Sequence, residues 1–364
     1  MSRVRRITSI VSMAIVVMLY GTAFAGMGHR VKALSHNAYN DDSPQINDSG
    51  QVAWTGVDGT DFEIYLFDGM KTTQLTDNVY SDVGPQINNS AQVVWYSREG
   101  SDNEIYLYDG SATIQLTDDA DDDFNPQIND GAQVVWYGFD GTDFEIYLYD
   151  GTTTLQLTNN AFHDRDPRIN ASGQVVWVGH DGNDNEIYLH DGATTVQLTD
   201  NAFSDSDPKI NDDGQVVWNG SDGTDFEIYL FDGIGTTIKL TDNDHFDASP
   251  QINAGGQVVW YGSPLSNNDD EIFFYDGTAV TQLTDNGPFF FDRNPQINDD
   301  GHIAWQGFDG DWKVYFYDGT AIKQLSKKSV SNIFPQINAG DQVVWRGANG
   351  NDSEIYLATP RADR

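Results

Sequence analysis

An acidic pattern with the spacing Asp-x-x-Asp-x-Glu recurs along this chain. Carboxylates held so close together repel one another unless a proton or a cation neutralises them, and Ca²⁺ takes about six to eight oxygen ligands from such flexible loops. The pattern therefore predicts calcium as a cofactor, with these candidate ligands: Asp58, Asp61, Glu63, Asp140, Asp143, Glu145, Asp181, Asp184, Glu186, Asp222, Asp225 and Glu227. Because Asp-Gly-Thr-Asp is also a good hairpin turn, and acidity keeps an exported protein soluble, a purely structural interpretation stays open.

Two basic residues form a second candidate site. Arg168 and Lys209 follow the prolines of two adjacent sequence repeats, at a position where the other repeats have glutamine. Two neighbouring cations near the axis of the fold could hold an anionic ligand. Sequence drift at a solvated position is the alternative interpretation.

Two loops also depart from the repeat. One is the longer segment 263–270, and the other contains the candidate ligand-binding residues Phe289, Phe290 and Phe291. Three phenylalanines on a loop either cap the core or form an exposed contact patch.

No catalytic residue is assigned from the sequence. The seven histidines occupy different repeat positions without a metal-ligand spacing, and there is no Gly-x-Ser-x-Gly, phosphate-loop or dinucleotide motif. If one catalytic centre exists, the neighbourhood of His163, Arg168 and Lys209 is the best candidate for it.

The elements that position these groups come from an internal repeat. Each unit contains Pro-Gln-Ile-Asn or a close variant, then Gln-Val-Val-Trp, Glu-Ile-Tyr-Leu, Asp-Gly and Gln-Leu-Thr. The prolines that mark the units are Pro44, Pro85, Pro126, Pro167, Pro208, Pro250, Pro295 and Pro335. A period near 40 residues with several short strands per unit is typical of repeat architectures such as propellers.

The third unit illustrates how the strands should pack. Segments 133–137 and 145–149 are rich in β-branched and aromatic residues, so we expect them to be strands. Ile146 and Tyr147 face opposite sides of the second strand, yet both are apolar, so each sheet must be covered on both faces. Radial stacking of four-stranded antiparallel blades does this, and it predicts an all-β, eight-bladed β-propeller in which the repeated tryptophans are inter-blade core.

The two ends of the repeat are complementary. The last unit stops at Leu357 without a Gln-Leu-Thr strand, while Lys32-Ala33-Leu34-Ser35 aligns with such a strand before the first proline. We therefore expect the N-terminal strand to complete the last blade and to close the ring.

The repeat also resembles a known family. Ile146-Tyr147-Leu148-Tyr149-Asp150-Gly151, Leu157-Thr158-Asn159-Asn160, Asp166-Pro167 and Gly173-Gln174-Val175-Val176-Trp177 together resemble the WD40-like repeat of the TolB-type β-propellers. Asn170 stands where that family has serine, and the Ser-Pro-Asp-Gly core is lost. The resemblance implies the propeller fold and, beyond it, a role of the Tol-Pal type in the cell envelope.

The N-terminal residues and the net charge indicate where the protein acts and which classes of partner it can bind. Residues 1–25 combine a basic start, an apolar stretch and Ala23-Phe24-Ala25, which predicts a cleavable signal peptide, with an uncleaved anchor as the alternative. Residues 26–364 then form a single propeller domain with no cysteine, and with 16 Lys and Arg against 56 Asp and Glu their formal net charge is −40. Such a surface disfavours nucleic acid and stable membrane insertion.

Three functions remain open. The first is an exported scaffold, periplasmic or extracellular, monomeric and stabilised by Ca²⁺, that binds a protein or another ligand. The second is a multivalent carbohydrate-binding protein, favoured if aromatic side chains are exposed at the same position in each blade. The third is an enzyme of the polysaccharide lyase or hydrolase kind, by analogy with related propellers.

Overall fold

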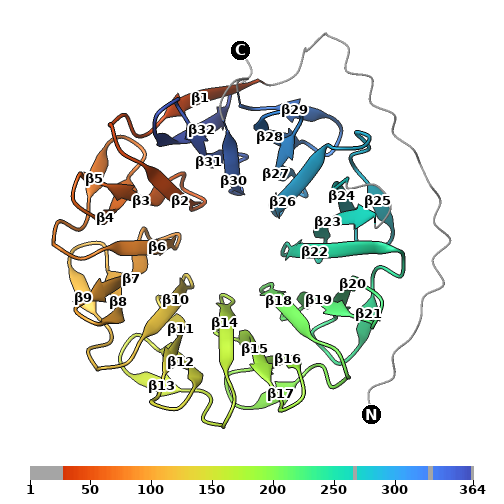
Figure 1. Cartoon of the computed structure of the whole chain (residues 1–364), viewed down its shortest axis with the longest axis horizontal. Helices are drawn as coiled ribbons and strands as arrows, with labels where there is room; N and C mark the ends of the chain where they lie inside the picture. The colour runs from red at the N-terminus through yellow and green to blue at the C-terminus, as the bar shows by residue number, and fades with distance from the viewer. Residues whose placement is uncertain (1–27, 265–268, 327–330, 362–364) are drawn as a thin grey trace.

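The computed structural model describes residues 28–264, 269–326 and 331–361. In these residues the chain forms eight four-stranded antiparallel sheets and no helix, and the sheets are arranged radially about one axis (Figure 1). The predicted all-β, eight-bladed propeller is confirmed. No helix of the described residues is long and apolar enough to cross a membrane. The predicted signal peptide, residues 1–25, lies outside the described residues.

The first four blades follow the chain in order, each from its innermost to its outermost strand. Their strands are β2 (Asp41–Ile46), β3 (Val52–Val57), β4 (Phe62–Phe67) and β5 (Thr72–Gln74); β6 (Asp82–Ile87), β7 (Val93–Glu99), β8 (Asp102–Tyr108) and β9 (Thr113–Gln115); β10 (Asp123–Ile128), β11 (Val134–Phe139), β12 (Phe144–Tyr149) and β13 (Thr154–Gln156); β14 (Asp164–Ile169), β15 (Val175–His180), β16 (Asn185–His190) and β17 (Thr195–Gln197).

The last four blades repeat this plan, and the eighth takes its outermost strand from the N-terminal part of the chain. Their strands are β18 (Asp205–Ile210), β19 (Val216–Ser221), β20 (Phe226–Phe231) and β21 (Thr237–Lys239); β22 (His245–Ile252), β23 (Val258–Pro264), β24 (Glu271–Tyr275) and β25 (Val280–Gln282); β26 (Phe291–Ile297), β27 (Ile303–Phe308), β28 (Trp312–Tyr317) and β29 (Ile322–Gln324); β30 (Asn332–Ile337), β31 (Val343–Ala348), β32 (Ser353–Pro360) and β1 (His29–Ala33).

The core consists of layers between neighbouring blades. The cluster between blades three and four, for example, contains Val135, Ile146, Leu148, Val175 and Trp177, all buried. All eight repeat tryptophans are at most 1% exposed, and each is stacked on the aromatic ring opposite it on the third strand of its blade. The prediction that they are inter-blade core, not platforms for sugars, is confirmed.

The closure of the ring is also as expected. Strand β1 pairs antiparallel with β32, with Lys32 opposite Leu357. The Leu34 amide donates to the Ile355 carbonyl (2.7 Å), and Ser35 accepts a hydrogen bond from the Ile355 amide (2.9 Å). Threonine or serine of Gln-Leu-Thr makes the same contact in the other blades. The N-terminal segment therefore replaces the missing outer strand in register.

A belt of asparagines joins the blades near the axis. In each blade the Asn of Pro-Gln-Ile-Asn donates from Nδ2 to the backbone carbonyl of the equivalent Asn in the next blade, at 2.9–3.1 Å, and Asn338 returns the belt to Asn47. These asparagines are at most 6% exposed. Because each buried carbonyl is satisfied by the neighbouring blade, the belt connects all eight interfaces.

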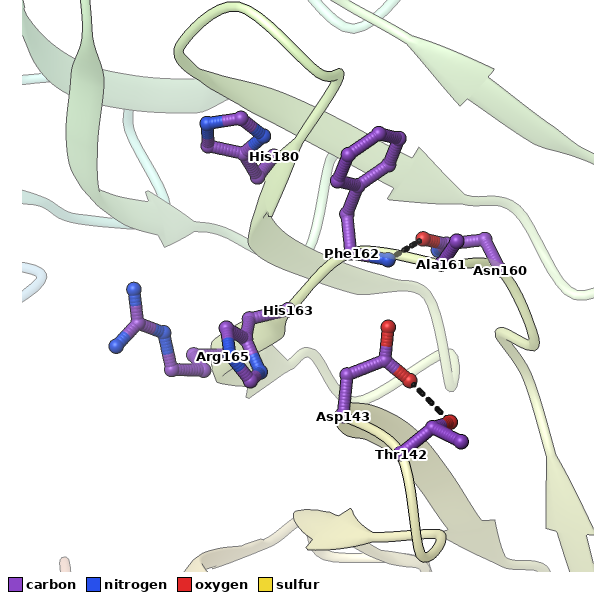
Figure 2. Close-up of a pocket in the computed structure, with 8 residues that line it drawn as sticks. All are labelled: Thr142, Asp143, Asn160, Ala161, Phe162, His163, Arg165 and His180. Carbon is purple, nitrogen blue, oxygen red and sulfur yellow. Dashed lines mark hydrogen bonds between the residues drawn. The ribbon is translucent and has the colours of Figure 1, made fainter.

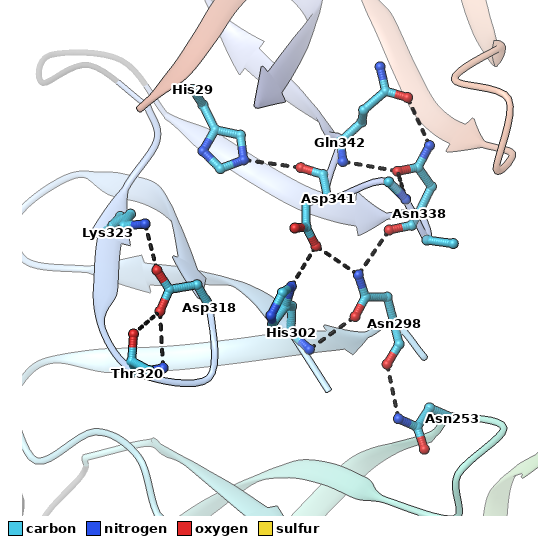
Figure 3. A network of polar contacts seen from close by, with 12 residues as sticks. His29, Asn253, Asn298, His302, Asp318, Thr320, Lys323, Asn338, Asp341 and Gln342 are labelled. Atoms are coloured by element: carbon cyan, nitrogen blue, oxygen red, sulfur yellow. Dashed lines mark hydrogen bonds and ion pairs between the residues drawn. The ribbon is translucent and has the colours of Figure 1, made fainter. Parts of the chain in front are cut away.

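Next to the closing strand, a histidine and an aspartate take part in the hydrogen bonds around the asparagine belt (Figure 3). His302 replaces the glutamine that follows the turn in the other blades, and its Nδ1 lies 2.6 Å from Asp341 Oδ1. Asp341 Oδ1 also accepts a hydrogen bond from Asn298 (3.0 Å), as the glutamine does elsewhere, and its carbonyl contacts His29 Nε2 (3.0 Å). The ring of His29 lies edge-on to Phe316, 4.9 Å between centroids, so the first strand is fixed to two blades.

Candidate metal and ligand sites

Seven of the eight blade interfaces enclose a buried glutamate and a buried aspartate. Between blades one and two, the Asn78 amide donates to Glu63 Oε1 (3.0 Å), and the Asn78 side chain donates to Asp82 Oδ2 (2.7 Å). Trp95 Nε1 donates to Asp82 Oδ1 (2.9 Å). Burial, together with the charge of the neighbouring Asp82, raises the pKa of Glu63 to about 7.

The remaining interface changes both acids together. Between blades seven and eight, Lys313 stands at the glutamate position and Asn332 at the aspartate position, where it still accepts from Trp345 Nε1 (2.9 Å). Lys313 forms an ion pair with Asp309. At this interface a lysine thus stands where the other seven interfaces have the buried glutamate.

The predicted calcium ligands come together in four blades. The candidate ligand atoms of each trio lie within 4.8 Å of one another, and the trios are Asp58, Asp61 and Glu63; Asp140, Asp143 and Glu145; Asp181, Asp184 and Glu186; Asp222, Asp225 and Glu227. The first and last residues of the four-residue turn between the second and third strands are the aspartates, and the third strand supplies the glutamate. The structure therefore brings the twelve candidate residues together as four trios, and calcium binding by them stays a prediction.

The glutamate of each trio has an unused oxygen. Glu63, Glu145, Glu186 and Glu227 are fully buried, and the Oε2 atom of each has no hydrogen-bond partner among the described residues. At the outer end of the first trio, hydrogen bonds from Thr60 lower the pKa of Asp58, so that this aspartate carries its charge at neutral pH. Each trio thus combines an ionised surface aspartate with a buried oxygen that lacks a donor.

The fifth blade places an ammonium group on its trio. Lys239 stands at the register position that glutamine occupies in the other blades, opposite the tyrosine of the third strand. Its Nζ lies 2.8 Å from Asp222 and 3.1 Å from Glu227, and it also contacts Asp242. Burial alone lowers the pKa of Lys239, but the three carboxylates raise it well above its usual value.

The second and eighth blades satisfy the corresponding glutamate oxygen internally, whereas Glu271 Oε2 of the sixth blade also has no partner among the described residues. In the second blade Thr117 donates its hydroxyl to Glu104 Oε2 (2.5 Å), and in the eighth Ser35 donates to Glu354 Oε2 (2.6 Å). In blades one, three and four no described residue donates to the buried Oε2, and in the fifth blade Lys239 contacts Glu227 Oε1 and leaves Oε2 without a hydrogen-bond partner. Sequence reasoning did not assign these roles, although the change from Gln-Leu-Thr to Lys-Leu-Thr at Lys239 is visible in the sequence.

Arg168 and Lys209 lie at equivalent positions of the neighbouring strands β14 and β18. Lys209 forms an ion pair with Asp207, and Arg168 donates to the carbonyl of Pro167 (3.2 Å). Burial lowers the pKa of Lys209, and Arg168 lowers it further, against the opposing effect of Asp207. His163 precedes β14 at the opposite end of that strand from Arg168, so the three residues do not form one cluster.

The two irregular loops meet each other. The Asp270 amide donates to the carbonyl of Phe290 (3.3 Å), and the Asp292 amide donates to the carbonyl of Asp270 (2.7 Å). Phe291 begins β26 and is partly buried, whereas Phe289 is 71% exposed and Phe290 is also exposed. Both interpretations of this loop thus hold in part: one ring joins the sheet and two face the solvent. Residues 265–268 of the other loop lie outside the described residues.

Sequence reasoning missed a pocket at the rim between blades three and four (Figure 2). It is a cavity of about 580 Å³ lined by Thr142, Asp143, Asn160, Ala161, Phe162, His163, Arg165 and His180. Phe162 is 41% exposed, and Tyr39 and Phe203 are similarly exposed at the same position of their blades. The signal in the sequence is the Asn-Ala-aromatic triplet, which occurs at 37–39, 160–162 and 201–203.

No family model and no curated protein matches this sequence. Among solved structures, the acylaminoacyl peptidase of Pyrococcus horikoshii is similar, with a TM-score of 0.54 and 12% identity over 86% of this chain and 58% of that chain. The β-propeller domain of the Trilobed protease from Pyrococcus furiosus has a TM-score of 0.56 and 15% identity over 78% of this chain and 96% of that domain.

Virginiamycin B lyase from Staphylococcus aureus has a TM-score of 0.52 and 11% identity over 92% and 99% of the two chains. The chain therefore spans less than two thirds of the peptidase but nearly all of the lyase. At these identities the likeness shows the propeller fold alone.

Proposed function

We propose that this protein is an exported, acidic binding scaffold of the TolB type whose blade turns bind Ca²⁺. The observation that carries the calcium proposal is the buried, unpartnered Oε2 of the glutamate in each trio. A buried carboxylate oxygen without a donor is unfavourable, and a cation bound between it and two aspartates removes that penalty.

The fifth blade supports this proposal from within the chain. Lys239 places one positive charge on Asp222 and Glu227, two members of its trio, whereas the corresponding residues of blades one, three and four form no ion pair among the described residues. The trios offer only oxygen atoms, and hard oxygen ligands from turns suit Ca²⁺ better than Zn²⁺ or Cu²⁺.

The direct test is a thermal melt of the purified protein in calcium chloride and in chelator, at matched ionic strength. Ligand at 100 times its Kd adds about 2.7 kcal/mol of stability per site, so the melting temperature should rise with calcium concentration. An unchanged melting temperature would sink the calcium proposal and leave the trios as turns.

The fifth blade supplies a matched variant for this test. Gln197→Lys gives the fourth blade the residue that Lys239 provides in the fifth, so calorimetry should find one calcium site fewer and the melt in chelator should move upward. Val196→Lys adds the same charge on the opposite face of β17 and should change neither. If the two lysine variants change the number of calcium sites and the melting temperature equally, the effect comes from net charge and not from the position of the lysine.

Export and family membership complete the proposal. The basic and apolar residues 1–25 direct the chain to a periplasm or to the outside of the cell, where an acidic monomer binds a protein or carbohydrate partner. Amino-terminal sequencing of the protein recovered outside the cytoplasm tests this, with Gly26 expected as the first residue.

A carbohydrate-binding function is the second candidate. The exposed rings of Tyr39, Phe162 and Phe203, at one repeated position, favour it, because aromatic faces in shallow surface sites stack on apolar faces of ligands. For the lyase or hydrolase alternative, the described residues offer no cluster joining His163 to Arg168 and Lys209.

A further inference from the structure

Basic groups gather in the rim pocket between blades three and four, although the molecule as a whole is acidic. His163 directly precedes β14, Arg165 lies at the start of β14, and His180 is at the end of β15 (Figure 2). No described carboxylate forms an ion pair with Arg165. The volume of about 580 Å³ is in the range of small-molecule sites.

Hydrogen bonds from the backbone fix both imidazoles. The Phe144 amide donates to His163 Nδ1 (3.0 Å), and the Gly182 amide donates to His180 Nδ1 (2.9 Å). An Nδ1 that accepts a hydrogen bond leaves the ring proton of a neutral histidine on Nε2. The second nitrogen of each ring is therefore a donor.

The pocket also contains an aromatic ring and an acceptor. Phe162 packs against His180, 5.3 Å between ring centroids, and against Gly182, yet 41% of it stays exposed. Asp143 accepts a hydrogen bond from Thr142 (3.0 Å) and has further lone pairs for a hydroxyl group. Donors, one aromatic face and one acceptor are thus combined in a single cavity.

We propose that this pocket binds a sugar ring that bears a carboxylate. Arg165 and the two imidazole N–H groups take the carboxylate, Phe162 stacks on the ring, and Asp143 accepts from a hydroxyl group. The proposal gives the carbohydrate-binding candidate a site and a ligand class, and it rests on that candidate.

The fifth blade provides the same framework without these donors. Ser204, Ser206 and Ser221 stand at the positions of His163, Arg165 and His180. Ser221 Oγ accepts from the Gly223 amide (3.1 Å), as His180 accepts from Gly182. Phe203 takes the place of Phe162. The chain therefore shows that a blade with these serines folds.

The test uses the triple variant H163S/R165S/H180S of the full chain. Binding of a trisaccharide of glucuronic acid and of cellotriose is measured by NMR titration and calorimetry in calcium-containing buffer. The native protein should bind the acidic sugar at millimolar concentration or below, and the neutral sugar roughly tenfold more weakly or worse. The triple variant should lose that preference while keeping its melting temperature.

Three outcomes would overturn the proposal. They are equal binding of acidic and neutral sugars, unchanged binding by the triple variant, and no binding of the acidic sugar at millimolar concentration. A further result separates this proposal from the carbohydrate-binding candidate. If both sugars bind equally and their binding is weakened by each of Phe162→Ala, Tyr39→Ala and Phe203→Ala, multivalent carbohydrate binding is supported and the carboxylate pocket is not. If the triple variant unfolds, the single variant R165S replaces it in the same comparison.

Discussion

Individual buried acids make the stability of this protein depend on pH. Burial, together with the charges of Asp292 and Asp269, raises the pKa of Glu271 to about 8. Burial also raises the pKa of Asp292 to about 7. In unfolded chains these groups titrate near 4.3 and 3.9, so the folded protein binds more protons between about pH 4 and pH 8. The stability that they contribute is full below about pH 4, falls progressively as the pH rises, and is lost above about pH 8.

Glu271→Gln should therefore remove part of this pH dependence. The amide keeps an oxygen for the Asn286 amide, which now donates to Glu271 (2.8 Å), and needs no proton. We expect the variant to melt above the native protein at pH 8 and to lose that advantage at pH 5, by differential scanning calorimetry. Asp285→Asn removes an exposed acid from the same loop and controls for net charge. A constant difference between the two pH values would contradict this interpretation.

At the scale of the elements, the outer strand of the eighth blade depends on one hydroxyl group. Ser35 donates to Glu354 Oε2 (2.6 Å) and accepts from the Ile355 amide (2.9 Å), and it is buried. Ser35→Ala leaves two buried polar groups without this partner, which costs about 1–3 kcal/mol. Urea unfolding should show that loss, and Ser35→Thr, the residue of most other blades, should restore stability. If alanine and threonine behave alike, the hydroxyl does not hold the strand.

These elements were largely predictable, and the sites only in part. The alternation of Ile146 and Tyr147 and the fixed period sufficed for the blades, because both depend on local pattern. The trios were predictable because spacing within one hairpin fixes which side chains meet. The buried pair of Glu63 and Asp82 was not, because its members come from different blades and meet only when the sheets stack. The rim pocket could not be predicted for the same reason, because its lining residues come from two blades.

At the scale of the whole molecule, the asparagine belt couples every blade to its two neighbours. Asn170 donates to the carbonyl of Asn211 (3.0 Å), and no edge interrupts the series. Asn170→Ala leaves that buried carbonyl without its donor and should lower the free energy of unfolding by about 1–3 kcal/mol. Because each blade is held from both sides, unfolding should remain one transition in calorimetry. The exposed Asn159→Ala is the control. Separate melting of some blades would contradict coupling through the belt.

The way in which the ends meet has a consequence for the order of the chain. The Arg361 amide donates to the Gly28 carbonyl (3.0 Å), so the first and last described strands finish side by side. A short peptide link could join them, and a new start could be opened in any exposed loop between blades. The sequence would then begin at a different repeat and specify the same ring. A circularly permuted chain that begins at any blade should therefore fold to the same closed ring.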